Sequence, residues 1–147
     1  MCGIFGYFCR SKISVQKALE LLEVLEKHQH KNLKETKPVG EHGAGICFVG
    51  NPDNLVIYKV GKTNTSPVKV LSKVREVAKA ESATVLGHVR RASKDFMDTI
   101  GYAEAAQPYK VNCLGFSEVV SAHNGKVENY MNIRKTFPKS TISNQKR

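Results

Sequence analysis

Residues 43–60 read GAGICFVGNPDNLVIYKV, and no other stretch of the chain indicates its local structure as clearly. Two apolar runs, 43–49 and 55–60, are separated by Gly50-Asn51-Pro52-Asp53-Asn54. Short apolar runs bounded by turn-forming residues predict strands, and the residues between them are typical of a hairpin connection. The stretch therefore predicts two neighbouring strands joined by a tight turn.

Strands and helices are also expected on both sides of this hairpin. Residues 3–9 (GIFGYFC) and 83–89 (ATVLGHV) predict buried strands, and a short strand is expected at 119–123. Residues 14–29 predict an amphipathic helix with one apolar face, made of Val15, Ala18, Leu19, Leu22 and Leu25.

A second helix is expected to begin at Ser66 and Pro67 and to run to about residue 80, because serine is a good N-cap and proline suits the first turn. A short third helix is expected over 126–135. Polar stretches at 30–42 and 90–108 are expected to be connections, and the tail 137–147 has no assignment. Strands and helices in this order predict a layered α/β or α+β domain.

The composition is that of an ordinary globular protein. The chain has 147 residues, of which 41% are hydrophobic and 24% charged, so a single domain is expected. No apolar run approaches the roughly 18 residues of a membrane span, and the N-terminus lacks the pattern of a secretory signal. We therefore expect a cytoplasmic protein with no membrane partner.

The net charge of +10 raises the question of nucleic-acid binding. The basic residues are spread evenly along the chain, and no aromatic-basic RNA-binding signature accompanies them. A solvated basic surface is the simpler interpretation, so no specific nucleic-acid binding is expected. The four cysteines, at 2, 9, 47 and 113, form no C-x-x-C pair, which argues against a zinc knuckle or a redox motif.

Cys2 is a candidate nucleophile because it directly follows the initiator methionine. Removal of Met1 would leave a cysteine whose thiol lies beside its own α-amine, and an α-amine with a pKa of about 8 can act as a base at neutral pH. Taken alone, a cysteine at the second position is better explained by chance.

Two further segments carry polar groups at the ends of expected strands. In GHVRRAS, residues 87–93, the planar fork of Arg90 suits bidentate binding of a carboxylate. In SAHNG, residues 121–125, the Asn124 side-chain amide stands next to the Gly125 N–H, and two such donors can stabilise one developing oxyanion. Separately, these segments are also typical of surface arginines and of an ordinary Asn-Gly turn.

Taken in order, MCGIFG at 1–6, HGAGI at 42–46, GHVRRAS at 87–93, Gln107-Pro108 and HNGKVENY at 123–130 resemble the successive motifs of class II glutamine amidotransferases. The resemblance implies an α+β fold of the N-terminal-nucleophile hydrolase type, a four-layer α-β-β-α sandwich. It covers residues 1 to about 130, and residues 1–147 would be one amidotransferase domain that is incomplete at its C-terminus.

The resemblance also implies roles for individual residues. Cys2 would attack the side-chain amide of glutamine and form a thioester, and Asn124 and Gly125 would form the oxyanion hole. Arg90 would bind the α-carboxylate of glutamine, with His88 and Ser93 as further substrate-binding residues of the same segment; His88 is expected to order that loop. The ammonia would pass to a synthase domain or subunit, and no cofactor or metal is expected.

Two departures from the family pattern keep an alternative open. Arg91 stands where the family usually has an aromatic residue, and the region Ser140-Thr141-Ile142-Ser143-Asn144 lacks the family's acidic residue for the α-amino group of glutamine. The alternative is an inactive amidotransferase-like subunit that binds or regulates. Two weaker hypotheses are a basic adaptor and a metal site formed by His28, His30 and His42, whose spacing suits zinc poorly.

Overall fold

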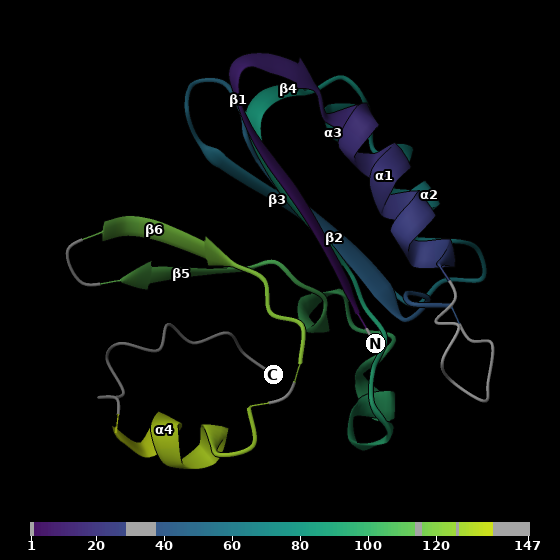
Figure 1. Cartoon of the computed structure of the whole chain (residues 1–147), viewed down its shortest axis with the longest axis vertical. Helices are drawn as coiled ribbons and strands as arrows, with labels where there is room; N and C mark the ends of the chain where they lie inside the picture. The colour runs from purple at the N-terminus through teal and green to yellow at the C-terminus, as the bar shows by residue number, and fades with distance from the viewer. Residues whose placement is uncertain (1, 29–37, 114–115, 126, 137–147) are drawn as a thin grey trace.

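A computed structural model describes residues 2–28, 38–113, 116–125 and 127–136 of the chain (Figure 1). These residues form strands and helices in mixed order along the sequence. The strands are β1 (Gly3–Ser14), β2 (Gly43–Val49), β3 (Leu55–Gly61), β4 (Glu81–Val89), β5 (Tyr109–Cys113) and β6 (Phe116–Ser121). The helices are α1 (Val15–Lys27), α2 (Pro67–Ser72), α3 (Arg75–Ala78) and α4 (Tyr130–Thr136), with two short 3-10 helices, η1 (Lys94–Thr99) and η2 (Ala103–Ala105).

The predicted hairpin is confirmed, and it forms one side of a four-stranded antiparallel sheet. The strand order is β1-β4-β2-β3, so β1 and β3 are the edges. In the hairpin Gly43 pairs with Gly61 and Val49 with Leu55, while β4 pairs with both β1 and β2. Because β4 is central, the residues that follow its end at Val89 lie beside both the start of β1 and the start of β2.

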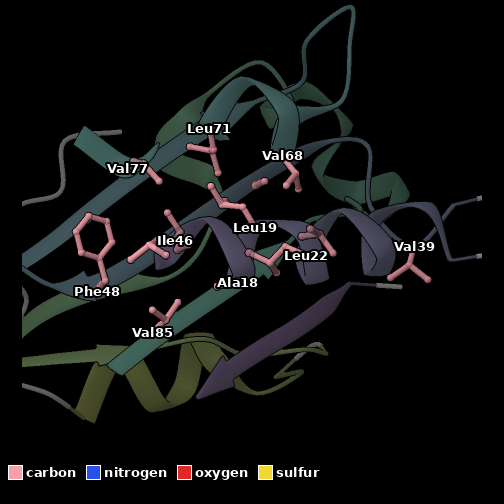
Figure 2. Packing of buried hydrophobic residues seen from close by; sticks show 13 residues of the cluster. Ala18, Leu19, Leu22, Val39, Ile46, Phe48, Val68, Leu71, Val77 and Val85 are labelled. Atoms are coloured by element: carbon pink, nitrogen blue, oxygen red, sulfur yellow. The ribbon is translucent and has the colours of Figure 1, made fainter. Parts of the chain in front are cut away.

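Helix α1 packs against this sheet through the apolar face that the sequence predicts. Ser14 caps the helix, since its hydroxyl accepts a hydrogen bond from the Gln16 N–H at 3.3 Å. Four of the five predicted residues are buried, and Leu25 is partly buried. Figure 2 shows how side chains of the helices and of the sheet interdigitate in this core, including Ala18, Leu19, Leu22, Ile46, Phe48, Val68, Leu71, Val77 and Val85.

The helix predicted from Ser66 to about residue 80 is wrong in one respect, because it is two helices. Ser66 is the N-cap as expected and accepts from the Lys69 N–H at 3.1 Å. The helical path is interrupted before α3, where Val74 has extended backbone angles. The turn at Val74 lets both Leu71 and Val77 reach the core, which one straight helix of this sequence would not achieve.

The β5–β6 hairpin lies on the side of the sheet opposite the helices (Figure 1). The segment that leads into this hairpin lies close to β2. A Cβ atom at Gly45 in β2 would be only 2.1 Å from the Gln107 carbonyl oxygen. The ammonium of Lys59 in β3 lies 4.6 Å from the centre of the Tyr109 ring. A side chain larger than glycine at position 45 would therefore push this layer off the sheet.

The C-terminal third differs most from the expectations. Strand β5 was not predicted, and the strand expected at 119–123 begins earlier and ends at Ser121. It ends there because His123 bonds the Gln107 side chain instead of a neighbouring strand. The expected helix 126–135 is reduced to α4, while residue 126 and the tail 137–147 lie outside the described residues.

The described chain is thus a mixed α and β structure built on antiparallel sheets, with helices on one face and a hairpin on the other. The four-layer α-β-β-α sandwich of the N-terminal-nucleophile hydrolases stays a prediction for this chain. None of the helices in the described part of the chain has the length and hydropathy of a membrane-spanning segment.

Candidate functional site

Cys2 and Asn124, which are 122 positions apart, are joined by two hydrogen bonds. The Cys2 N–H donates to Asn124 Oδ1 at 3.3 Å, and Asn124 Nδ2 donates to the Cys2 carbonyl oxygen at 2.6 Å. One side-chain amide therefore binds both backbone groups of the predicted nucleophile. Nδ2 carries two hydrogens, and the contact with Cys2 uses one of them, so the other can serve a second acceptor.

The Cys2 sulfur faces the backbone of the segment that follows β4. The Arg91 N–H donates to Cys2 Sγ at 3.3 Å, and the Arg91 carbonyl oxygen lies 3.4 Å from the same sulfur as an acceptor for the thiol. Strand β1 carries Cys2 to this point because Gly3 pairs with Val89 at the end of β4. The structure thus brings the first motif and the GHVRRAS motif together at one end of the sheet.

The Asn124-Gly125 turn is held in place by Gln107. The Gln107 side chain donates through Nε2 to the His123 carbonyl oxygen at 3.0 Å and accepts through Oε1 from the His123 N–H. Gly125 has a φ of +142°, a conformation that L side chains rarely adopt. The position requires glycine for backbone reasons, and its N–H makes no hydrogen bond among the described residues.

Arg90 is buried just after β4, and its guanidinium is already bonded. It donates through Nη1 to the Thr99 carbonyl oxygen at 3.2 Å and through Nη2 to Thr99 Oγ1 at 2.6 Å. These bonds use two of the five guanidinium donors. Binding of a carboxylate by Arg90 stays a prediction, and it would require the remaining donors or displacement of Thr99.

His88 and Ser93 differ sharply in their exposure. The His88 side chain is fully buried, and neither ring nitrogen has a hydrogen-bond partner among the described residues. Burial lowers the pKa of His88 to about 4, and the charges of Arg90 and His123 add to the shift. Ser93 is exposed beside η1. In this conformation His88 offers no surface to a ligand and makes no side-chain hydrogen bond to the loop that it was expected to order. That role and the substrate-binding roles stay predictions.

Arg91 does not cover the site as an aromatic residue would. Its guanidinium donates to the Pro38 carbonyl oxygen and lies 3.8 Å from Glu41 Oε1, with only 16% of the side chain exposed. The same carboxylate oxygen lies 3.3 Å from His42 Nε2. The arginine is therefore folded back onto the segment that precedes β2.

Sequence reasoning did not place several residues that complete this region at the candidate site. His42 is buried and accepts a hydrogen bond from the Ala92 N–H through Nδ1 at 3.0 Å. Tyr109 is close enough to Arg90 and Cys2 for both to affect its hydroxyl, although burial is the main reason its pKa is raised. The sequence shows the pairs His42-Gly43 and Gln107-Pro108, but neither pair indicates which residue its side chain will form a hydrogen bond with.

The described residues contain no group of three or more His, Cys, Asp or Glu side chains arranged to hold a metal ion. Of the three histidines of the metal hypothesis, His30 lies outside the described residues, and His42 bonds the Ala92 backbone.

No family model, no curated protein and no solved structure matches this chain. The resemblance to the class II amidotransferases therefore depends on the quoted sequence motifs alone.

Proposed function

We propose that this chain is a cytoplasmic, glutamine-hydrolysing domain of the class II amidotransferase type, with Cys2 as its nucleophile. The observation that carries the proposal is the pair of hydrogen bonds between Cys2 and Asn124. The sequence motifs predict a nucleophile at one position and an oxyanion donor at the other, and these two positions are in contact. Chance resemblance of separate motifs gives no reason for such a contact.

In this proposal the reaction begins after removal of Met1, when the Cys2 nitrogen becomes an α-amine with a pKa of about 8. The amine accepts the thiol proton as Sγ attacks the side-chain amide carbon of glutamine, and the carbonyl electrons move onto oxygen. The second Nδ2 hydrogen of Asn124 and the Gly125 N–H are the donors for that oxygen.

The tetrahedral adduct then collapses. The carbon–nitrogen bond breaks, the proton held by the amine passes to the leaving nitrogen, and ammonia departs to leave a γ-glutamyl thioester on Cys2. The same amine next takes a proton from water, whose oxygen attacks the thioester carbon. The carbon–sulfur bond breaks, the proton returns to sulfur, and glutamate is released.

Substrate binding and ammonia transfer complete the proposal. Arg90, next to the loop that contacts Cys2, is the proposed partner of the glutamine α-carboxylate, and His88 and Ser93 belong to the same segment. The ammonia would be consumed by a synthase domain or subunit that carries the acceptor site. No cofactor or metal takes part in this scheme.

Glutamate release from glutamine by the purified full chain tests the proposal. Wild type should hydrolyse glutamine, and Cys2→Ser should lose activity by at least about a thousandfold, the scale expected when the attacking atom is replaced. Cys9→Ser is the matched control, because Cys9 is a free cysteine of β1, the strand that directly follows Cys2, and among the described residues the Asn124 side chain bonds Cys2 and not Cys9. Equal activity of wild type and Cys2→Ser would disprove the proposal.

The alternative is an amidotransferase-like subunit that binds but does not hydrolyse. The bonds between Arg90 and Thr99 favour it, since the guanidinium that would bind the glutamine carboxylate already has partners. The acidic residue that the family uses for the substrate amine has no counterpart in 140–144, a region outside the described residues. Glutamine binding by calorimetry without release of glutamate would support this alternative.

A further inference from the structure

Glu41, His42 and Arg91 form a cluster behind Cys2, which we call the back cluster. It joins the segment before β2 to the segment after β4 through backbone as well as side chains. The His42 N–H donates to the Arg90 carbonyl oxygen at 2.9 Å, and the Arg90 N–H donates to the Gly43 carbonyl oxygen at 2.8 Å. These bonds extend the pairing of the two strands beyond their ends.

The His42 imidazole adds one bond that the backbone cannot supply. Its Nδ1 accepts from the Ala92 N–H at 3.0 Å, so that nitrogen carries no proton in this arrangement. The proton of the neutral ring is then on Nε2, which lies 3.3 Å from Glu41 Oε1. Contacts at both ring nitrogens, with Ala92 and with Glu41, thereby hold the His42 side chain in place.

The residue that His42 fixes is the next neighbour of the residue that contacts the nucleophile. Ala92 follows Arg91, whose N–H donates to Cys2 Sγ at 3.3 Å. A donor at this distance stabilises negative charge on sulfur as the thiol loses its proton. If Ala92 were free to move, the Arg91 peptide group would no longer be held against the sulfur.

We propose that His42 is a positioning residue of the site: it acts through Ala92 to hold the Arg91 N–H against the Cys2 sulfur. This inference rests on the proposed function for its meaning in catalysis, but the contact that it describes exists without substrate. The sequence motifs gave His42 no such role.

The role requires a neutral His42. Burial lowers the pKa of His42, and the positive charges of Lys62, Arg91 and Arg90 lower it further, whereas Glu41 opposes them. A protonated ring would place an N–H at Nδ1 against the Ala92 N–H, and the bond would be lost.

Two variants separate the hydrogen bond from the bulk of the ring. His42→Leu removes the acceptor, and His42→Asn keeps an acceptor oxygen at the δ position. The readout is the rate of alkylation of Cys2 by iodoacetamide in the full chain from pH 6 to pH 9, resolved by peptide mass spectrometry. Cys9 provides the internal reference in the same sample. Since alkylation needs no glutamine, its result is independent of whether the proposed hydrolysis occurs.

In His42→Leu, we expect the Cys2 rate at pH 7 to fall about tenfold and its pH profile to move to higher pH, as expected for the loss of one hydrogen bond to a charged group. His42→Asn should stay within about twofold of wild type, and Cys9 should not change. If glutamine is hydrolysed, kcat should follow the same order with little change in KM. A wild-type Cys2 profile in His42→Leu would overturn the proposal, as would equal shifts in the two variants.

Nitrogen NMR of wild type tests the same contact if His42→Leu fails to fold. The proposal predicts that the His42 proton is on Nε2 at neutral pH and that the Ala92 amide resonance changes when the ring is protonated. A proton on Nδ1 at neutral pH would overturn it.

Discussion

At the scale of single residues, the Asn124 side chain contributes most to the proposed site. It satisfies both backbone groups of Cys2 with one planar amide. A net hydrogen bond stabilises a protein by about 0.5–1.5 kcal/mol, so the pair is strong enough to hold the start of β1 against the Asn124-Gly125 turn. Conversion of the Cys2 nitrogen to an amine would preserve its role as a donor to Oδ1.

His88 is a second residue with a measurable consequence. Both of its ring nitrogens are buried without partners among the described residues, and an unpaired buried polar group is costly. We expect His88→Leu to be neutral or to stabilise the protein by about 1 kcal/mol at pH 7, because it removes those polar atoms while keeping an apolar side chain. Urea unfolding measures this difference, and a loss of more than about 2 kcal/mol would contradict it.

The pH dependence of the same residue has a defined sign. The unfolded chain protonates this histidine near its ordinary pKa of 6.5, whereas the folded protein does so only near 4. Between these values the unfolded state binds more protons, so stability falls as the pH falls. Between pH 7 and pH 5, wild type should lose about 2 kcal/mol through His88. The loss should be smaller in His88→Leu, and equal losses in both proteins would count against the burial of a neutral ring.

At the scale of elements, Glu26 connects two helices of the core. It is buried near the end of α1, accepts from the Ser66 hydroxyl, and accepts from the Val68 N–H at 3.3 Å at the start of α2. Burial is the main cause of its raised pKa, while the bonds from Ser66 and Val68 act in the opposite direction. The carboxyl group thus accepts from the hydroxyl of the N-cap and from one backbone N–H that the first turn of α2 would otherwise leave unpaired.

Substitutions at Glu26 should therefore separate charge from hydrogen bonding. Glu26→Ala should destabilise the protein by about 2–3 kcal/mol, because it leaves buried donors without an acceptor. Glu26→Gln keeps an acceptor and removes the charge that burial disfavours, so a change below about 1 kcal/mol is expected at pH 7. Urea unfolding with far-ultraviolet circular dichroism distinguishes the two. An equal loss in both variants would show that the carboxylate charge, and not the acceptor, is what matters.

The elements that the sequence predicted well are those with local causes. The β2–β3 hairpin follows from its turn residues. Helix α1 follows from the helical spacing of its apolar residues, and two of them, Leu19 and Leu22, are buried in the core. The break between α2 and α3 could not be predicted, because it depends on where the sheet lies beneath Leu71 and Val77. Strand β5 was missed for a related reason, since its contact with the large sheet, between Tyr109 and Lys59 of β3, joins residues far apart in sequence.

In the candidate site, too, some features could be predicted from local sequence and others could not. Cys2 and Asn124 were predicted from motifs, and the roles of nucleophile and oxyanion donor that the resemblance implies require the two residues to lie close together. The bonds from Gln107 to His123 and from His42 to Ala92 join residues far apart in sequence. No local pattern specifies such pairs, so only the fold could show that these residues support the segments around Cys2.

At the scale of the whole molecule, the sheet brings three parts of the chain to one end. The start of β1, the end of β4 and the turn after β6 meet around Cys2, while α1, α2 and α3 cover the far face of the sheet (Figure 1). The core and the site therefore occupy different parts of the fold. Substitutions at the site should change reactivity more than stability, which makes the nucleophile testable in a folded protein.

The most direct test of the central claim is an intact mass spectrum of the purified chain before and after incubation with a glutamine-like diazo-ketone, which alkylates an N-terminal cysteine nucleophile. We predict that the protein lacks Met1 and gains a single label, and that the label is absent in Cys2→Ala but present in Cys9→Ala. Retention of Met1, or a wild-type chain that gains no label, would contradict the claim that this chain carries a working N-terminal nucleophile.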